Sequence, residues 1–154
     1  MSSRAPSSVV VYIDGASRGN PGPSGIGIAV FPYDDQTKSI AEISRYIGIT
    51  TNNVAEYEAL IHALKWLITS NVKYATIKLD SELVYKQLSG KYKVRSPHMA
   101  IQIERVERMK VKIEACSFIL IPRTENKIAN RLAQKAAKKV KINKQSFTQE
   151  KLIK

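Results

Sequence analysis

The sequence predicts a single α/β domain in which a five-stranded mixed sheet, an antiparallel meander followed by βα units, is flanked by helices. Short β-branched runs separated by turn-rich segments fill the first fifty residues, which is typical of a meander. After Thr51, segments with strand-like and helix-like patterns alternate. This alternation implies crossover connections and therefore parallel pairing. A length of 154 residues fits one domain with its own core.

The expected strands follow runs of β-branched and other apolar residues. They cover residues 9–13, 26–31, 37–49, 74–79 and 116–121. The first run stops at Asp14-Gly15, and the Gly- and Pro-rich stretch that follows it, residues 18–25, indicates a loop. Pro122 ends the last strand.

The expected helices follow apolar residues spaced three or four positions apart. They cover residues 54–68, 82–89, 97–111 and 125–139. Ser96-Pro97 is a typical helix start, because proline is tolerated in the first turn. The last helix has an apolar inner face made of Ile128, Leu132, Ala133, Ala136 and Val140.

Composition limits the remaining possibilities. Residues 1–8 are expected to form a flexible leader, 9–140 the folded domain and 141–154 a basic C-terminal tail. Cys116 is the only cysteine, which excludes an intramolecular disulfide and a cysteine-cluster zinc site and fits a reducing compartment. No apolar run approaches the roughly 20 residues that span a bilayer. We therefore expect a cytoplasmic protein without a membrane segment, and nothing demands more than a monomer.

The net charge of +12 is unevenly distributed: residues 1–50 carry no net charge, whereas residues 101–154 carry +9. A positive field of this size attracts polyanions, because neutralising phosphates releases their condensed counterions. Charge alone favours a nucleic acid without excluding an anionic membrane surface or a basic surface kept for solubility.

In so basic a chain the placement of the acids is informative. Asp14 follows the first expected strand, Asp80 follows the fourth, and Glu56 lies in the first turn of the long helix. The carboxyl ends of neighbouring strands meet at one edge of a sheet, so these carboxylates can converge. Oxygen-rich clusters suit Mg²⁺ or Mn²⁺, and two such ions about 3.5–4 Å apart can act together on a phosphodiester.

Each acid also has a simpler explanation. Asp14 before Gly15 resembles a turn former. Glu56 follows Asn53 by three positions, as in a capping box, and Asp80 precedes a helix that it could cap.

Four segments resemble the motifs of type 1 ribonuclease H. They are Tyr12–Pro23, Thr51–Glu56, Leu79–Ser81 and Ile121–Ala133. The resemblance implies the ribonuclease H-like fold and an endonuclease that hydrolyses the RNA strand of RNA·DNA hybrids, leaving 5′-phosphate and 3′-hydroxyl ends. It also implies two Mg²⁺ ions per site, with Mn²⁺ as a substitute. The short connections and the lack of a histidine before the last helix are similar to the archaeal and related bacterial branch.

The resemblance assigns roles to the matching positions. Asp14, Glu56, Asp80 and position 130 would form the catalytic metal site, with Asp14 bridging both ions and Glu56 near a ribose 2′-hydroxyl. Thr51, helped by Asn20, would match a pocket for a DNA phosphate. The expected nucleic-acid contacts are Gly15, Ser17, Arg18, Asn20, Thr51, Asn52, Asn53, Ser81, Lys91, Lys93 and Arg123.

The sequence departs from the family at its fourth metal position, which is normally aspartate and here is Asn130. Three explanations stay open: an engineered substitution, a natural carboxamide ligand, or a shifted alignment. The alternative function is therefore an impaired or inactive hybrid-binding protein. An integrase or junction resolvase on the same fold is disfavoured by the Thr51-Asn52-Asn53 segment. A small-molecule phosphate binder is disfavoured because residues 15–25 lack a P-loop pattern.

Overall fold

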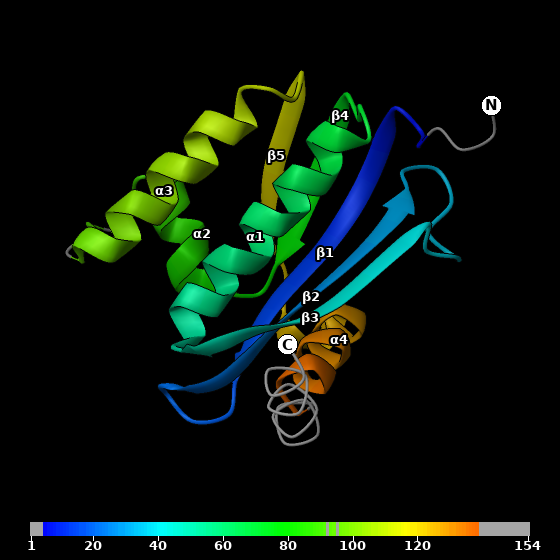
Figure 1. The fold of residues 1–154 in the computed structure, drawn as a ribbon. Coiled ribbons are helices and arrows are strands. Elements are labelled where there is room, and N and C mark those ends of the chain that lie inside the picture. Colours follow the sequence, from blue (N-terminus) through cyan, green and yellow to red (C-terminus); the bar gives the residue numbers. More distant parts are fainter. Residues whose placement is uncertain (1–4, 92, 95, 139–154) are drawn as a thin grey trace, which may run out of the picture.

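A computed structural model describes residues 5–91, 93–94 and 96–138. Five strands form one sheet in the order β3-β2-β1-β4-β5 (Figure 1). The strands are β1 (Ser8–Ser17), β2 (Gly22–Pro32), β3 (Ala41–Thr50), β4 (Tyr74–Leu79) and β5 (Ala115–Leu120). The β1–β2 and β2–β3 pairs are antiparallel, whereas β1–β4 and β4–β5 are parallel. The predicted mixed sheet is confirmed.

The helices cover the sheet on both faces. They are α1 (Asn52–Thr69), α2 (Glu82–Leu88), α3 (Pro97–Lys110) and α4 (Lys127–Lys138), with a 3₁₀ turn, η1, over Arg123–Glu125. Figure 1 shows α1, α2 and α3 on one face and α4 on the other. Within the described part of the chain, no helix is long and apolar enough to cross a membrane.

The sheet around β1 is packed on both faces, which accounts for the continuous apolar run at the start of this strand. Val9, Val11 and Ile13 are fully buried in the main core, to which α1 contributes Leu60 and Leu64. On the other face, Ala29, Phe31 and Leu132 form a smaller buried cluster, against which Tyr12 and Ile128 pack.

The first two strands are longer than expected. β1 continues through Ser17 and pairs with β2 down to Ser17 opposite Ser24, so Asp14 lies inside the strand rather than at its end. Gly25, one of the glycines that indicated a loop, serves packing instead: a Cβ there would lie 2.6 Å from the Ala133 carbonyl oxygen of α4. Glycine here lets α4 approach the backbone of β2 closely.

Other boundaries differ by a few residues. β3 begins at Ala41 rather than at residue 37, because Asp35 accepts two hydrogen bonds from Thr37 in the preceding turn. The expected helix from residue 125 divides into η1 and α4. Val140 and the predicted tail 141–154 lie outside the described residues, as do residues 1–4 of the predicted leader.

Candidate active site

Three carboxylates from separate elements converge at the centre of the sheet. Asp14 on β1, Glu56 in the first part of α1 and Asp80 just after β4 each offer an oxygen, and these atoms all lie within 4.8 Å of one another. Asp14 is 1% exposed and Glu56 7% exposed, while Asp80 is half-buried. The convergence predicted from the sequence is therefore present.

The strand register explains why the two aspartates meet. Tyr12 lies opposite Lys78 in the parallel β1–β4 pair. Two residues further along each segment, Asp14 lies beside Asp80. Glu56 reaches them because α1 passes very close to β1. A Cβ on Gly15 would lie 2.3 Å from the backbone carbon of Ala55, so only glycine permits this approach.

The electrostatics of the three acids are unfavourable without a cation. Burial, and then the Asp14 carboxylate beside it, holds the pKa of Glu56 well above its ordinary value. Burial also raises the pKa of Asp80, an effect that Asn126 opposes by donating a hydrogen bond and Arg123 opposes by its charge. These directions follow from placing like charges in a poorly solvated site.

Asn130 lies one turn into α4 and faces this centre. Its Nδ2 donates a hydrogen bond of 2.8 Å to Asp14 Oδ2. A carboxylate only accepts hydrogen bonds, so the amide must present its nitrogen to Asp14. In this arrangement Asn130 supports Asp14 as a donor, which differs from the oxygen ligand that a fourth aspartate would supply.

The donor set fits a divalent cation of the Mg²⁺ or Mn²⁺ type. All three acids offer hard oxygen atoms, which these ions prefer. Moreover, Glu56 Oε1 is buried and has no hydrogen-bond partner among the residues that the structure describes. Buried polar atoms are normally paired, so this oxygen needs either a proton or a cation.

The simpler explanations for Glu56 and Asp80 are wrong. Thr51 is the N-cap of α1 and accepts a hydrogen bond from the Val54 amide, so Glu56 has no place in a capping box with Asn53. Ser81, which was expected to contact nucleic acid, caps α2 in the same way, which leaves Asp80 free of that role.

The start of α1 gathers several residues that were expected to bind nucleic acid. Asn20 Oδ1 accepts a hydrogen bond of 3.0 Å from the Asn52 amide, which joins the β1–β2 loop to the helix start beside Thr51. Ser17 donates its hydroxyl to the Thr50 carbonyl and so holds this loop. Asn20 and Asn52 remain exposed, whereas Thr51 and Ser17 are partly buried.

The basic residues of the prediction are exposed but dispersed. Arg18 lies in the β1–β2 loop, Lys91 and Lys93 lie between α2 and α3, and Arg123 lies in η1. Arg123 is close enough to Asp80 for its charge to lower the pKa of that carboxyl. Arg123 therefore acts on the acidic centre, whereas Arg18, Lys91 and Lys93 make no hydrogen bond or ion pair with the three acids among the described residues.

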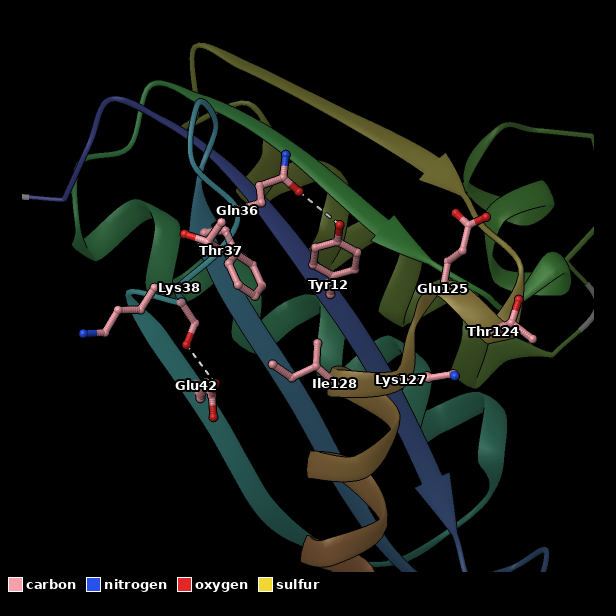
Figure 2. A pocket seen from close by; sticks show the side chains of 11 residues that line it. Tyr12, Gln36, Thr37, Lys38, Glu42, Thr124, Glu125, Lys127 and Ile128 are labelled. Atoms are coloured by element: carbon pink, nitrogen blue, oxygen red, sulfur yellow. Dashed lines mark hydrogen bonds between the residues drawn. The ribbon is translucent and has the colours of Figure 1, made fainter.

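A pocket of about 580 Å³ lies between the β2–β3 turn and the start of α4, and none of the three acids lines it (Figure 2). Tyr12 lies in its wall, with its ring edge-on to Phe31 and its hydroxyl donating to Gln36. Lys38 and Lys127 line it together with Glu42 and Glu125. The charges are balanced, so this pocket lacks the concentrated negative charge of the three acids.

Known proteins are similar to this chain in sequence and in overall fold. A family described as reverse transcriptase-like matches residues 12–136. RNase H1 of Halobacterium salinarum superposes with a TM-score of 0.80 at 36% identity, over 84% of this chain and 96% of that one. The chain belongs to the ribonuclease H family. LC11-RNase H1, isolated from compost and crystallised with an RNA/DNA hybrid, gives a TM-score of 0.79 at 37% identity, over 86% of this chain and 98% of that one.

Two curated relatives of this ribonuclease H domain are longer than the chain. The bifunctional protein Rv2228c of Mycobacterium tuberculosis is 38% identical over 128 residues, which are 83% of this chain and 35% of that protein. Ribonuclease HI of Halobacterium salinarum is 37% identical over 128 residues, which are 83% of this chain and 63% of that protein. The chain thus spans between a third and two thirds of the length of these relatives.

Sequence reasoning gave no role to Asn126, although its side chain is fully buried beside the acids. It stands in the segment Glu125-Asn126-Lys127, in which a polar residue directly before a helix reads as an ordinary cap. Only the structure shows that its side chain turns toward the sheet, where it donates to Asp80.

Proposed function

We propose that the protein is an endonuclease that hydrolyses the RNA strand of RNA·DNA hybrids with the help of divalent cations. The observation that supports this most is the convergence of Asp14, Glu56 and Asp80 within 4.8 Å, with one buried carboxylate oxygen unpaired. The family relationship and the hybrid-bound relative LC11-RNase H1 support the substrate class. The products carry 5′-phosphate and 3′-hydroxyl ends.

The three acids are the metal ligands in this proposal, and two Mg²⁺ ions, or Mn²⁺ in their place, are the cofactor. Such ions stabilise the charge that develops on the attacking and leaving oxygens of the phosphodiester. Asp14 takes the central position, as in the family's motif, and it is the acid to which Asn130 donates. Asn130 keeps Asp14 oriented through its amide hydrogen bond. Glu56 faces the ribose 2′-hydroxyl, which distinguishes RNA from DNA.

The hybrid is held by backbone and polar groups around the start of α1. Asn20, Asn52 and Asn53 contact the minor groove, and Thr51 with Asn20 receives a DNA phosphate at the helix N-terminus. The joined β1–β2 loop and helix start support this assignment, because the Asn20–Asn52 hydrogen bond fixes their relative position. Gly15, Ser17, Arg18, Ser81, Lys91, Lys93 and Arg123 complete the proposed contacts. The net charge of +12 favours association with the polyanionic hybrid. In this proposal the protein acts as a cytoplasmic monomer.

A hybrid-binding protein that turns over poorly is the second candidate. The observation that favours it is the hydrogen bond from Asn130 to Asp14, because an amide nitrogen in that position is a donor and supplies no negative charge. Both candidates bind the hybrid, and only the first one cuts it.

Cleavage of end-labelled substrates tests the proposal. An RNA·DNA hybrid, duplex DNA and duplex RNA are incubated with the protein in Mg²⁺ or Mn²⁺, and the ends of the products are mapped. We expect cutting of the RNA strand of the hybrid alone, and none in EDTA. Binding of the hybrid without cutting in either metal would favour the second candidate, and cutting of duplex DNA would contradict the substrate assignment.

A further inference from the structure

Asn126 is buried between the sheet and the start of α4. Its side chain is 0% exposed, and Nδ2 lies 2.8 Å from the Ile13 carbonyl oxygen and 2.8 Å from Asp80 Oδ2. An amide nitrogen carries two hydrogens, one for each of these acceptors. Its backbone carbonyl also accepts the Asn130 amide at 3.0 Å. One residue therefore joins the backbone of β1, the acid that follows β4 and the first turn of α4.

Asp80 depends on such a partner. β4 ends at Leu79, so Asp80 lies beyond the last residue that the β1–β4 and β4–β5 ladders hold. Asp14 repels its charge, because the two carboxylates share a poorly solvated site. Without a donor, the side chain would turn toward solvent, since it is only half-buried.

The orientation of the Asn126 amide follows from chemistry. Turned by 180°, its oxygen would face a carbonyl oxygen and a carboxylate oxygen, neither of which can donate. The observed orientation leaves Asn126 Oδ1 buried without a partner among the described residues. Burying an unpaired acceptor is unfavourable, so the two donated hydrogen bonds are the feature that favours asparagine here.

We infer that Asn126 is a positioning residue: by donating to Ile13 and Asp80 together, it fixes Asp80 against β1 so that this carboxylate faces Asp14 and Glu56. This inference rests on the proposed function, in which the three acids hold a divalent cation. Asn126 itself touches neither cation nor substrate.

Two substitutions remove the donors in different ways. Asn126→Ala deletes the amide, and Asn126→Asp keeps the shape while placing a carboxylate against two oxygen atoms. We expect each substitution to weaken Mn²⁺ binding, which calorimetry measures without nucleic acid. The kcat of hybrid cleavage should fall by about 10- to 100-fold, which is the usual effect of removing a partner of a metal ligand. KM and hybrid binding in EDTA stay unchanged, because the nucleic-acid contacts lie elsewhere.

Asn71→Asp is the matched control, because Asn71 is exposed and has a positive φ of 58° that aspartate also tolerates. It makes the same change of charge and should leave Mn²⁺ affinity at the parent value. Thermal unfolding shows whether each variant is folded before any titration.

A second measurement needs no substitution at position 126. In the parent, the side-chain amide of Asn126 gives an ¹H–¹⁵N signal. Asp80→Ala should shift this signal and should accelerate the hydrogen exchange of the amide, because the substitution removes one of its two acceptors. An unchanged signal overturns the inference, and so does parent-like Mn²⁺ affinity in a folded Asn126→Ala. A parent that binds Mn²⁺ but cuts no hybrid contradicts the proposed function alone, whereas a parent that binds no Mn²⁺ contradicts both.

Discussion

α1 and α4 lie on opposite faces of the sheet (Figure 1). The first part of each helix brings one side chain to Asp14, and the two side chains act on it in opposite ways. α1 brings Glu56, an acid with an unpaired buried oxygen, and so adds repulsion. α4 brings Asn130, whose amide donates to Asp14, and thereby relieves repulsion. Glu56 on α1 increases the negative charge that a cation would neutralise. Asn130 on α4 holds Asp14 beside the other acids when no cation is bound.

The contrast between α1 and α4 explains how a folded chain tolerates a buried cluster of acids. Like charges in a poorly solvated site destabilise the fold unless donors or a proton compensate. Here the donors are neutral amides, which hold the carboxylates in place without replacing the negative charge that a cation needs. Substitutions at Asp14, and then on the α4 side and the α1 side, separate these contributions.

Asp14→Asn should have the largest effect, because Asp14 is the group on which both sides act. The substitution removes the central charge, so cleavage should fall by at least about 10³-fold, as when a member of a catalytic unit is lost. Single-turnover cleavage measures this, and hybrid binding in EDTA is the control that should not change. Equal losses of binding and cleavage would make Asp14 a residue of the fold.

Asn130→Asp changes the α4 side into a second acidic side. With a fourth carboxylate, Mn²⁺ affinity should rise by about 10-fold or more, within the range reported for changes around metal sites. The metal-free protein should become less stable, since a donor to Asp14 is replaced by a charge. Calorimetry and urea unfolding measure the two effects, with Asn71→Asp as the control. No gain in affinity or rate would contradict the account.

Gly15→Ala disturbs the α1 side through packing alone. The new Cβ would lie 2.3 Å from the backbone of Ala55, so α1 must move away from β1 and take Glu56 with it. Overpacking of this kind costs about 1–3 kcal/mol of unfolding free energy. Gly48→Ala is the comparison, because a Cβ there meets no atom within 4 Å and reports only the cost of its positive φ. Parent-like stability and Mn²⁺ affinity in Gly15→Ala would contradict the packing argument.

Glu56→Gln removes the charge that the α1 side contributes, and it should make the stability of the metal-free protein less dependent on pH. The pKa of Glu56 is raised by folding, so the unfolded chain loses its proton first as pH rises. Stability is therefore greatest below the ordinary glutamate pKa and falls as pH approaches the raised one. Glutamine removes this loss, which is about 1.4 kcal/mol for each unit of raised pKa. Part of the slope remains, because the pKa of Asp80 is also raised.

Urea unfolding in EDTA between about pH 4 and 9 measures this slope. Glu82→Gln is the control: Glu82 is exposed and pairs with Lys86, which lowers its pKa, so its removal should change stability little and with the opposite sign. An identical slope in the parent and Glu56→Gln would contradict the assignment.

The sequence predicted the convergence of the acids for a physical reason. Asp14 was expected to follow the first strand and Asp80 the fourth, and neighbouring parallel strands present their carboxyl ends at one edge. The two strands do pair in parallel, although Asp14 lies within β1. The expected end of β1 at residue 13 and the expected start of β2 at residue 26 were wrong, because Gly15 and Gly25 indicated a turn and a loop. Gly25 and Gly27 both lie in β2. They are strand residues whose missing side chains make room for α4, a contact between segments about a hundred residues apart.

Asn126 and Gly15 could not be assigned from the sequence for a similar reason. The partner of Asn126 on β1 is a backbone carbonyl 113 residues away, which leaves no local pattern. The role of Gly15 depends on the path of α1 across β1. Thr51 and Ser81, in contrast, are caps of a type that a sequence pattern does indicate.

Single-turnover cleavage of an RNA·DNA hybrid by the parent and by Asn130→Asp, in Mg²⁺ and in Mn²⁺, decides whether the acidic centre is catalytic. The claim is that three carboxylates, with an amide in place of a fourth, form a working catalytic centre. We predict that the parent cuts the RNA strand in at least one metal and that Asn130→Asp cuts it faster. Cutting by Asn130→Asp together with binding but no cutting by the parent would contradict the claim.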